Sequence, residues 1–139
     1  MLPRLLLLVF SLLLTCSVAG AQALHTPAKG SLERQRILDA ARVKVAADLS
    51  YQGPILFQVR DLKVSRGWAL LNAQPVTPAG VPIRKDCLES DEITVVLLRS
   101  HAGAWRVERG GTVCATDAFW LDWPQELGAP VEVFELTGE

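Results

Sequence analysis

The sequence predicts an α+β fold, in which one N-terminal amphipathic helix packs on an antiparallel sheet of about four to five strands held by one disulfide. Three observations predict it. A helical repeat of apolar residues follows a short leader, two pairs of strand-like segments with tight turns come next, and two cysteines remain in the body of the chain. Because the helix and the strands are segregated along the sequence, we expect the helix to cover one face of the sheet.

The leader has the layout of a secretory signal peptide. Arg4 precedes an apolar run that ends at Leu14, and small residues follow as far as Ala23. The apolar run is about ten residues long, half of the roughly 20 that a membrane-spanning helix requires, so a membrane anchor is disfavoured. We expect residues 1–23 to be a signal peptide, cleaved after Ala23 or two residues earlier. Residues 24–139 then form a single exported α+β domain with no transmembrane segment.

Cys16 leaves two interpretations of the leader open. The run Leu13-Leu14-Thr15-Cys16 resembles the bacterial lipoprotein box, in which the cysteine is lipidated after cleavage. That box has Gly, Ala or Ser directly before the cysteine, whereas this chain has Thr15. We therefore favour removal of Cys16 with the signal peptide and a protein free in the bacterial periplasm. The alternative is a protein held to a membrane by a lipid on Cys16.

The helix is expected from about Ser31 to Leu49. Ser31 is a suitable N-cap, and Glu33 lies in the first turn, where the helix dipole favours an acid. Apolar residues then recur at helical spacing and form one stripe, made of Ile37, Leu38, Ala41, Val45 and Leu49. The pair Gly53-Pro54 breaks the helix.

The first hairpin follows this break, where the apolar period becomes that of a strand. Alternation from Ile55 slips at Arg60-Asp61, which indicates a β-bulge. Ser65-Arg66-Gly67 is a tight turn, and residues 68–73 form the returning strand.

A long irregular connection from Gln74 to Asp91 leads to the second hairpin. Its first strand, residues 92–99, is the most apolar of the chain, and residues 101–103 form the turn. Its partner strand begins near Trp105, and Gly110-Gly111 is expected to end it. Near the C-terminus, residues 131–136 are expected as a short final strand.

Cys87 and Cys114 are the two cysteines of the expected domain. In an oxidising compartment such a pair in a small domain predicts one disulfide, worth about 3–4 kcal/mol on the chain-entropy model. A metal site needs three or four ligands, and the only histidines, His25 and His101, lie in a tail and a turn. We therefore expect no metal ion and no catalytic thiol.

The formal net charge of −1 gives no indication of a nucleic acid or an anionic membrane as partner. The charges are unevenly distributed, since bases predominate from Lys29 to Arg66 and every charged residue from Gly110 to Glu139 is acidic. Two interpretations are open. The favoured one is that the two ends meet in the fold and neutralise each other, and the other is that the acidic end is a binding surface.

No catalytic motif stands out. The chain has no Gly-rich phosphate loop and no G-x-S-x-G motif, and His101 is expected to be solvated in its turn. Asp117 and Asp122 are expected to be solvated or N-capping rather than an acid–base pair. An enzyme is therefore the less favoured alternative, and no cofactor is expected.

The four tryptophans give the better indication of a site. Trp68 and Trp105, one on each hairpin, are expected to fill the core under the helix. For the C-terminal aromatic residues two interpretations are open, filling of the core or exposure on a loop as flat platforms for a sugar or a protein anchor. The candidate binding residues are Phe119, Trp120, Trp123, Asp117 and Asp122.

Several motifs carry a resemblance, namely Arg36-Ile37-Leu38-Asp39-Ala40-Ala41-Arg42, Phe57-x-Val59-x-x-Leu62-x-Val64 with Gly67-Trp68-Ala69, Trp105-x-Val107 and Thr116-Asp117. Over roughly residues 34–134 the chain resembles a group of small exported bacterial proteins of unknown function. That resemblance implies export and one compact domain, and it assigns no catalytic residue. The order of helix and sheet is also similar to cystatin-like and NTF2-like folds, which bind proteins or small ligands, but a fold does not fix a function.

Together, export, a disulfide and the lack of catalytic motifs favour a non-catalytic periplasmic binding or inhibitory module. Its expected partner is a protein of the cell envelope, either an enzyme or a toxin. The alternative is a cell-wall or small-ligand binding protein that uses exposed tryptophans.

Overall fold

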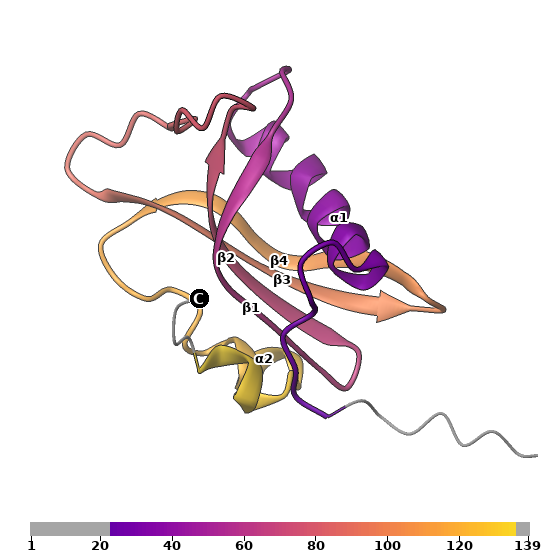
Figure 1. Ribbon diagram of the computed structural model, residues 1–139. Helices are drawn as coiled ribbons and strands as arrows, with labels where there is room; N and C mark the ends of the chain where they lie inside the picture. The colour runs from indigo at the N-terminus through magenta and orange to yellow at the C-terminus, as the bar shows by residue number, and fades with distance from the viewer. Residues whose placement is uncertain (1–22, 136–139) are drawn as a thin grey trace, which may run out of the picture.

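The computed structural model describes residues 23–135, where a four-stranded antiparallel sheet has one long helix on one face and the C-terminal segment on the other (Figure 1). The spatial order of the strands is β1-β2-β3-β4. The elements are α1 (Leu32–Asp48), β1 (Leu56–Ser65), β2 (Trp68–Val76), β3 (Asp91–His101), β4 (Ala104–Ala115), the short helix α2 (Trp123–Leu127) and the 3₁₀ turn η1 (Val131–Phe134). The predicted α+β fold is confirmed, and the long helix lies at Leu32–Asp48, after the leader, close to the expected Ser31 to Leu49. The expected signal peptide up to residue 22, with Cys16, lies outside the described residues.

Helix α1 has the expected cap and the expected buried stripe. The Ser31 side chain accepts a hydrogen bond from the backbone N–H of Arg34 at 3.2 Å, which satisfies one of the free donors at the helix start. Ile37, Ala41 and Val45 are fully buried. The stripe therefore fixes which side of α1 lies on the sheet.

The first hairpin confirms both the bulge and the turn. The pairing of β1 with β2 shifts register between Val59 and Asp61. At the turn Arg66 and Gly67 have φ values of 49° and 77°, the left-handed conformations of a two-residue hairpin turn whose twist matches that of the strands.

The predicted end of the second hairpin at Gly110-Gly111 is wrong, because β4 continues to Ala115. Both glycines have positive φ. A Cβ at Gly110 would overlap the Val95 carbonyl, and one at Gly111 would overlap the carboxylate of Asp48 at the end of α1. The absence of side chains at these two positions therefore lets β4 run close to both β3 and the end of α1, where a turn was expected.

The predicted final strand at residues 131–136 is also wrong over the part that the structure describes. Residues 131–134 form η1, which follows Pro130 and packs the fully buried Val133 onto the sheet. A strand needs a free strand edge to pair with, whereas this segment crosses the face of the sheet, where the backbone groups already bond within the sheet.

The domain has a separate apolar core on each face of the sheet. On the α1 face the core includes Leu62, Ala69, Leu71, Val96 and Leu98. On the opposite face the C-terminal segment covers Trp68, Leu70, Val95 and Leu97. The expectation that Trp68 lies under the helix is thus wrong, since its side chain points to the other face.

The predicted disulfide between Cys87 and Cys114 is confirmed, with a Cα–Cα distance of 5.6 Å. It ties the connection between β2 and β3 to the end of β4. Leu88, the next residue, has 93% of its surface exposed, so this connection projects into solvent.

Candidate functional site

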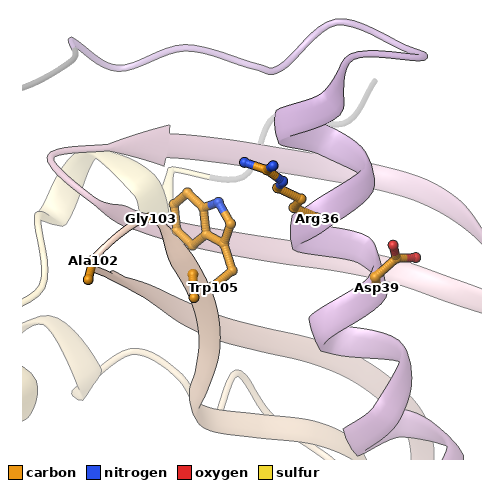
Figure 2. Close-up of a pocket in the computed structure, with 6 residues that line it drawn as sticks. Arg36, Asp39, Ala102, Gly103 and Trp105 are labelled. Atoms are coloured by element: carbon orange, nitrogen blue, oxygen red, sulfur yellow. The ribbon is translucent and has the colours of Figure 1, made fainter.

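Two adjoining hollows lie between α1 and β4, and both are lined by Trp105. The first, of about 450 Å³, lies at the tip of the β3–β4 hairpin against Arg36 and Asp39 (Figure 2). The second, of about 410 Å³, continues along the strand towards Val107. We call the two together the α1–β4 groove.

The helical wall of the groove is a second apolar face of α1, beside the buried stripe. Ala40, Val43 and Ala47 follow one another at helical spacing and line the second hollow. Val43 has 75% of its surface exposed, so no part of the described chain covers this wall. The small alanines leave room between the helix and the strand.

The strand wall is formed by Trp105 and Val107. Alternate residues of a strand point to the same face, and both side chains pack partly against the core under α1. The tip residues Ala102, Gly103 and Ala104 are small and do not cover the indole. Figure 2 shows the side chain of Arg36 reaching from α1 towards the indole of Trp105.

The charged side chains around the groove differ in their pairing. Asp39 forms an ion pair with Arg42, and Lys44 pairs with Asp48 one turn further on. Among the ion pairs of residues 23–135, none involves Arg36 or Arg106, and both are exposed. Arg36 therefore offers a basic group at the rim of the groove, and Arg106 offers one on the adjoining strand β4.

The C-terminal candidate residues lie on the opposite face of the sheet from the groove. Phe119 packs edge-to-face against Trp120 and Trp123, with ring centroids 5.2 and 5.6 Å apart. Trp123 is only 5% exposed and Trp120 is half-buried, whereas Asp117 and Asp122 are exposed. The structure thus brings the five residues together in one segment, where Trp123 faces the core.

The two histidines each face one carboxylate. His101 Nε2 lies 3.0 Å from Glu108 Oε1 at the tip of the second hairpin. The imidazole of His25 bonds to the Ala23 carbonyl, which together with the Glu33 carboxylate raises the pKa of His25 above 6.5 despite partial burial. His25 also pairs through its backbone with Val64 of β1, so it fastens the lead-in, the segment of residues 23–31 before α1, to the sheet. Neither pair includes a nucleophile.

The expected neutralisation of the basic part by the acidic end is seen at one corner of the sheet. Glu132 pairs with Arg66 at 3.1 Å and accepts a hydrogen bond from the Ser65 hydroxyl at 2.9 Å. A backbone hydrogen bond at Glu132 itself, followed by the Ser65 hydroxyl, lowers the pKa of Glu132. The sheet separates α1 from the acidic segment elsewhere, so Arg36 on α1 is too far from it to be neutralised in this way.

Within the part of the chain that the structure describes, no group of three or more His, Cys, Asp or Glu side chains is arranged to hold a metal ion. None of the helices there has both the length and the apolar character needed to cross a bilayer. Comparisons with protein-family models, with curated proteins and with solved structures found no match to this chain.

Sequence reasoning missed the α1–β4 groove. It placed Trp105 in the core and treated the helix as having one apolar stripe. The observation that points to the groove is the second helical series Ala40, Val43 and Ala47, which a single sheet face cannot bury together with the first stripe.

Proposed function

We propose that the protein is a non-catalytic binding module of the bacterial periplasm that recognises a protein partner through the α1–β4 groove. The observation that carries the proposal is the pair of apolar walls, formed by Val43 and its neighbours on α1 and by Trp105 and Val107 on β4. Export from the cytosol, expected from the leader, is part of the same proposal.

Three properties of the groove support a protein as its ligand. Its walls belong to a long helix and a strand, which hold the site more rigidly than loops. Half-buried tryptophan is among the residues that most often anchor protein interfaces. The exposed Val43 leaves the groove open along one side, whereas sites for small molecules enclose most of the ligand surface.

The alternative, a cell-wall or small-ligand binder that uses the C-terminal tryptophans, has less support. A stacking platform needs an exposed indole face, and Trp123 is buried against the sheet while Trp120 is half-buried against Phe119.

The test is photo-crosslinking in living cells with a photoreactive amino acid at position 43 of the full-length chain. Position 81 is the matched control, because Val81 is also an exposed valine but lies on the β2–β3 connection. We expect a discrete protein adduct in the envelope from position 43 and not from position 81. No adduct at position 43, or the same adducts at both positions, would overturn the proposal.

A further inference from the structure

We infer that the partner enters the α1–β4 groove as an extended segment that alternates apolar and acidic residues and pairs with the free edge of β4. This inference rests on the proposed function and adds to it the conformation and the chemistry of the bound segment. It follows from the backbone of β4, from the two faces of that strand and from the charges beside it.

The backbone of β4 has bonding groups that point into the groove. Within residues 23–135, β4 lies at the end of the sheet and pairs with β3 alone. Its turn has two residues, so His101 and Ala104 form the hydrogen-bonded closing pair and the next pair, Ser100 with Trp105, is not hydrogen-bonded. Consistently, the Ser100 N–H donates to the Gly67 carbonyl on the other side of β3, at 2.7 Å.

The backbone N–H and C=O of Trp105 therefore point away from β3, and those of Val107 do so two residues later. Both residues also line the groove with their side chains. An added strand that bonds to them lies beside β4 and beneath the apolar wall of α1.

The stretch open for pairing is short and has defined ends. It begins at the hairpin tip and ends near the register shift opposite Leu97 and Leu98. Further along β4, the outer edge of the strand is already bonded to the end of α1, because the Thr112 N–H donates to the Asp48 carboxylate at 2.9 Å. The geometry thus fits a few residues of an extended segment, with no room for a long strand.

The two faces of β4 call for different side chains on the added strand. Residues facing α1 would contact Val43, Trp105 and Val107, which favours apolar groups. Arg106 alternates with Trp105 and Val107 and so points to the other face, where it stands opposite Arg99 of β3. Two like charges in directly paired positions are unfavourable, so acidic side chains of an added strand would relieve them.

Arg36 adds a further base at the tip of the groove. The bound segment therefore alternates apolar residues towards α1 with acidic residues towards Arg106. Main-chain hydrogen bonds would supply affinity and the alternate side chains would supply specificity, as in other cases of strand addition.

The first experiment measures amide hydrogen exchange by NMR on the wild-type protein. The probe is a short synthetic peptide that alternates glutamate and valine, and the control is the same peptide with lysine in place of glutamate. We expect the glutamate peptide to slow exchange at Trp105 and Val107 while Arg106, already bonded to β3, changes little. Equal binding of the lysine peptide would overturn the acidic part of the inference.

Backbone pairing is tested from the side of the peptide, which leaves the fold of the protein untouched. Methylation of the peptide nitrogen that faces β4 should weaken binding by about tenfold, because a buried carbonyl on β4 loses its donor. Methylation of the next nitrogen along, which faces solvent, is the control. Equal affinities for the two methylated peptides would overturn strand pairing.

Protein variants test the same surface. Val43→Glu places a charge in the apolar wall and should weaken peptide binding by at least about tenfold, whereas the matched Val81→Glu on the β2–β3 connection should leave it unchanged. Arg106→Glu should weaken binding of the glutamate peptide and improve that of the lysine peptide. The control is Arg60→Glu, at an exposed arginine of β1, on the opposite edge of the sheet from β4.

These outcomes separate the inference from the proposed function. If position 43 gives a discrete cellular adduct that position 81 does not give, but the glutamate peptide protects neither Trp105 nor Val107, the groove binds a partner and strand addition is wrong. If light scattering shows that two copies associate through β4 and that Val43→Glu separates them, the occupant is a second copy and the acidic segment is wrong.

Discussion

The C-terminal layer predicts a large loss of stability when Trp123 is truncated to alanine. The indole is 5% exposed and packs in the core that also holds Leu70 and Leu97. Truncation of a buried aromatic residue typically costs about 3–5 kcal/mol. The free energy of transferring the indole from water to the protein interior gives a similar value. Burial of roughly 150–250 Å² of aromatic surface at about 25 cal/mol per Å² is worth about 4–6 kcal/mol. A typical domain has about 5–15 kcal/mol in total, so Trp123→Ala should be close to unfolding.

Urea unfolding of the oxidised protein, followed by circular dichroism, measures this loss. The matched control is Trp120→Ala, which removes a half-buried indole from the same segment and should cost about half as much or less. A loss below about 1 kcal/mol for Trp123→Ala, or a greater loss for Trp120→Ala, would refute the second core as the role of this segment.

Three further predictions concern single contacts. Replacement of Cys87 and Cys114 by serine should lower the free energy of unfolding by about 3–4 kcal/mol relative to the oxidised wild type, and reduction of the wild type should lower it by the same amount. Because the pKa of His25 is raised in the folded protein, its pairing stabilises the fold below the unfolded pKa of 6.5 and this contribution disappears as the pH rises through the folded value. The stability difference between wild type and His25→Gln should thus be greater at about pH 5.5 than at about pH 8, by a fraction of 1 kcal/mol, and an equal difference would contradict the pairing. Gly111→Ala should cost about 2–3 kcal/mol in a thermal or urea melt, more than Gly80→Ala, where φ is also positive but the space is open.

The helix and the two hairpins could be predicted because their determinants are local. Ser31 caps α1, and the slip at Arg60-Asp61 and the turn at Arg66-Gly67 each depend on a few neighbouring residues. The second covering layer depends on contacts distant in sequence. The sequence nevertheless contains a signal for this second layer, since β2 and β3 include the continuous apolar runs 68–71 and 95–98. Strands that are apolar on both faces must be covered on both.

The errors at Gly110-Gly111 and at residues 131–136 have one cause. In both cases a local pattern was correct about propensity, and a tertiary contact decided the outcome. Glycine pairs favour turns, yet here they let β4 approach the Asp48 carboxylate and the ring of Trp123. Alternating apolar and acidic residues favour a strand, yet Val133 is held on the face of a sheet that offers no free edge there.

The two edges of the sheet explain why the groove lies at β4 rather than at β1. The outer edge of β1 is occupied in part by the lead-in, since His25 and Val64 exchange backbone hydrogen bonds of 2.9 and 2.8 Å. A bulge between Val59 and Asp61 twists its remainder. Proteins usually protect exposed edges by such means. At β4 no described segment covers the stretch from Trp105 to Val107, the bulge follows only at Glu108, and the apolar wall of α1 lies beside the stretch. An added strand there gains backbone bonds and apolar contacts together, which the edge of β1 does not offer.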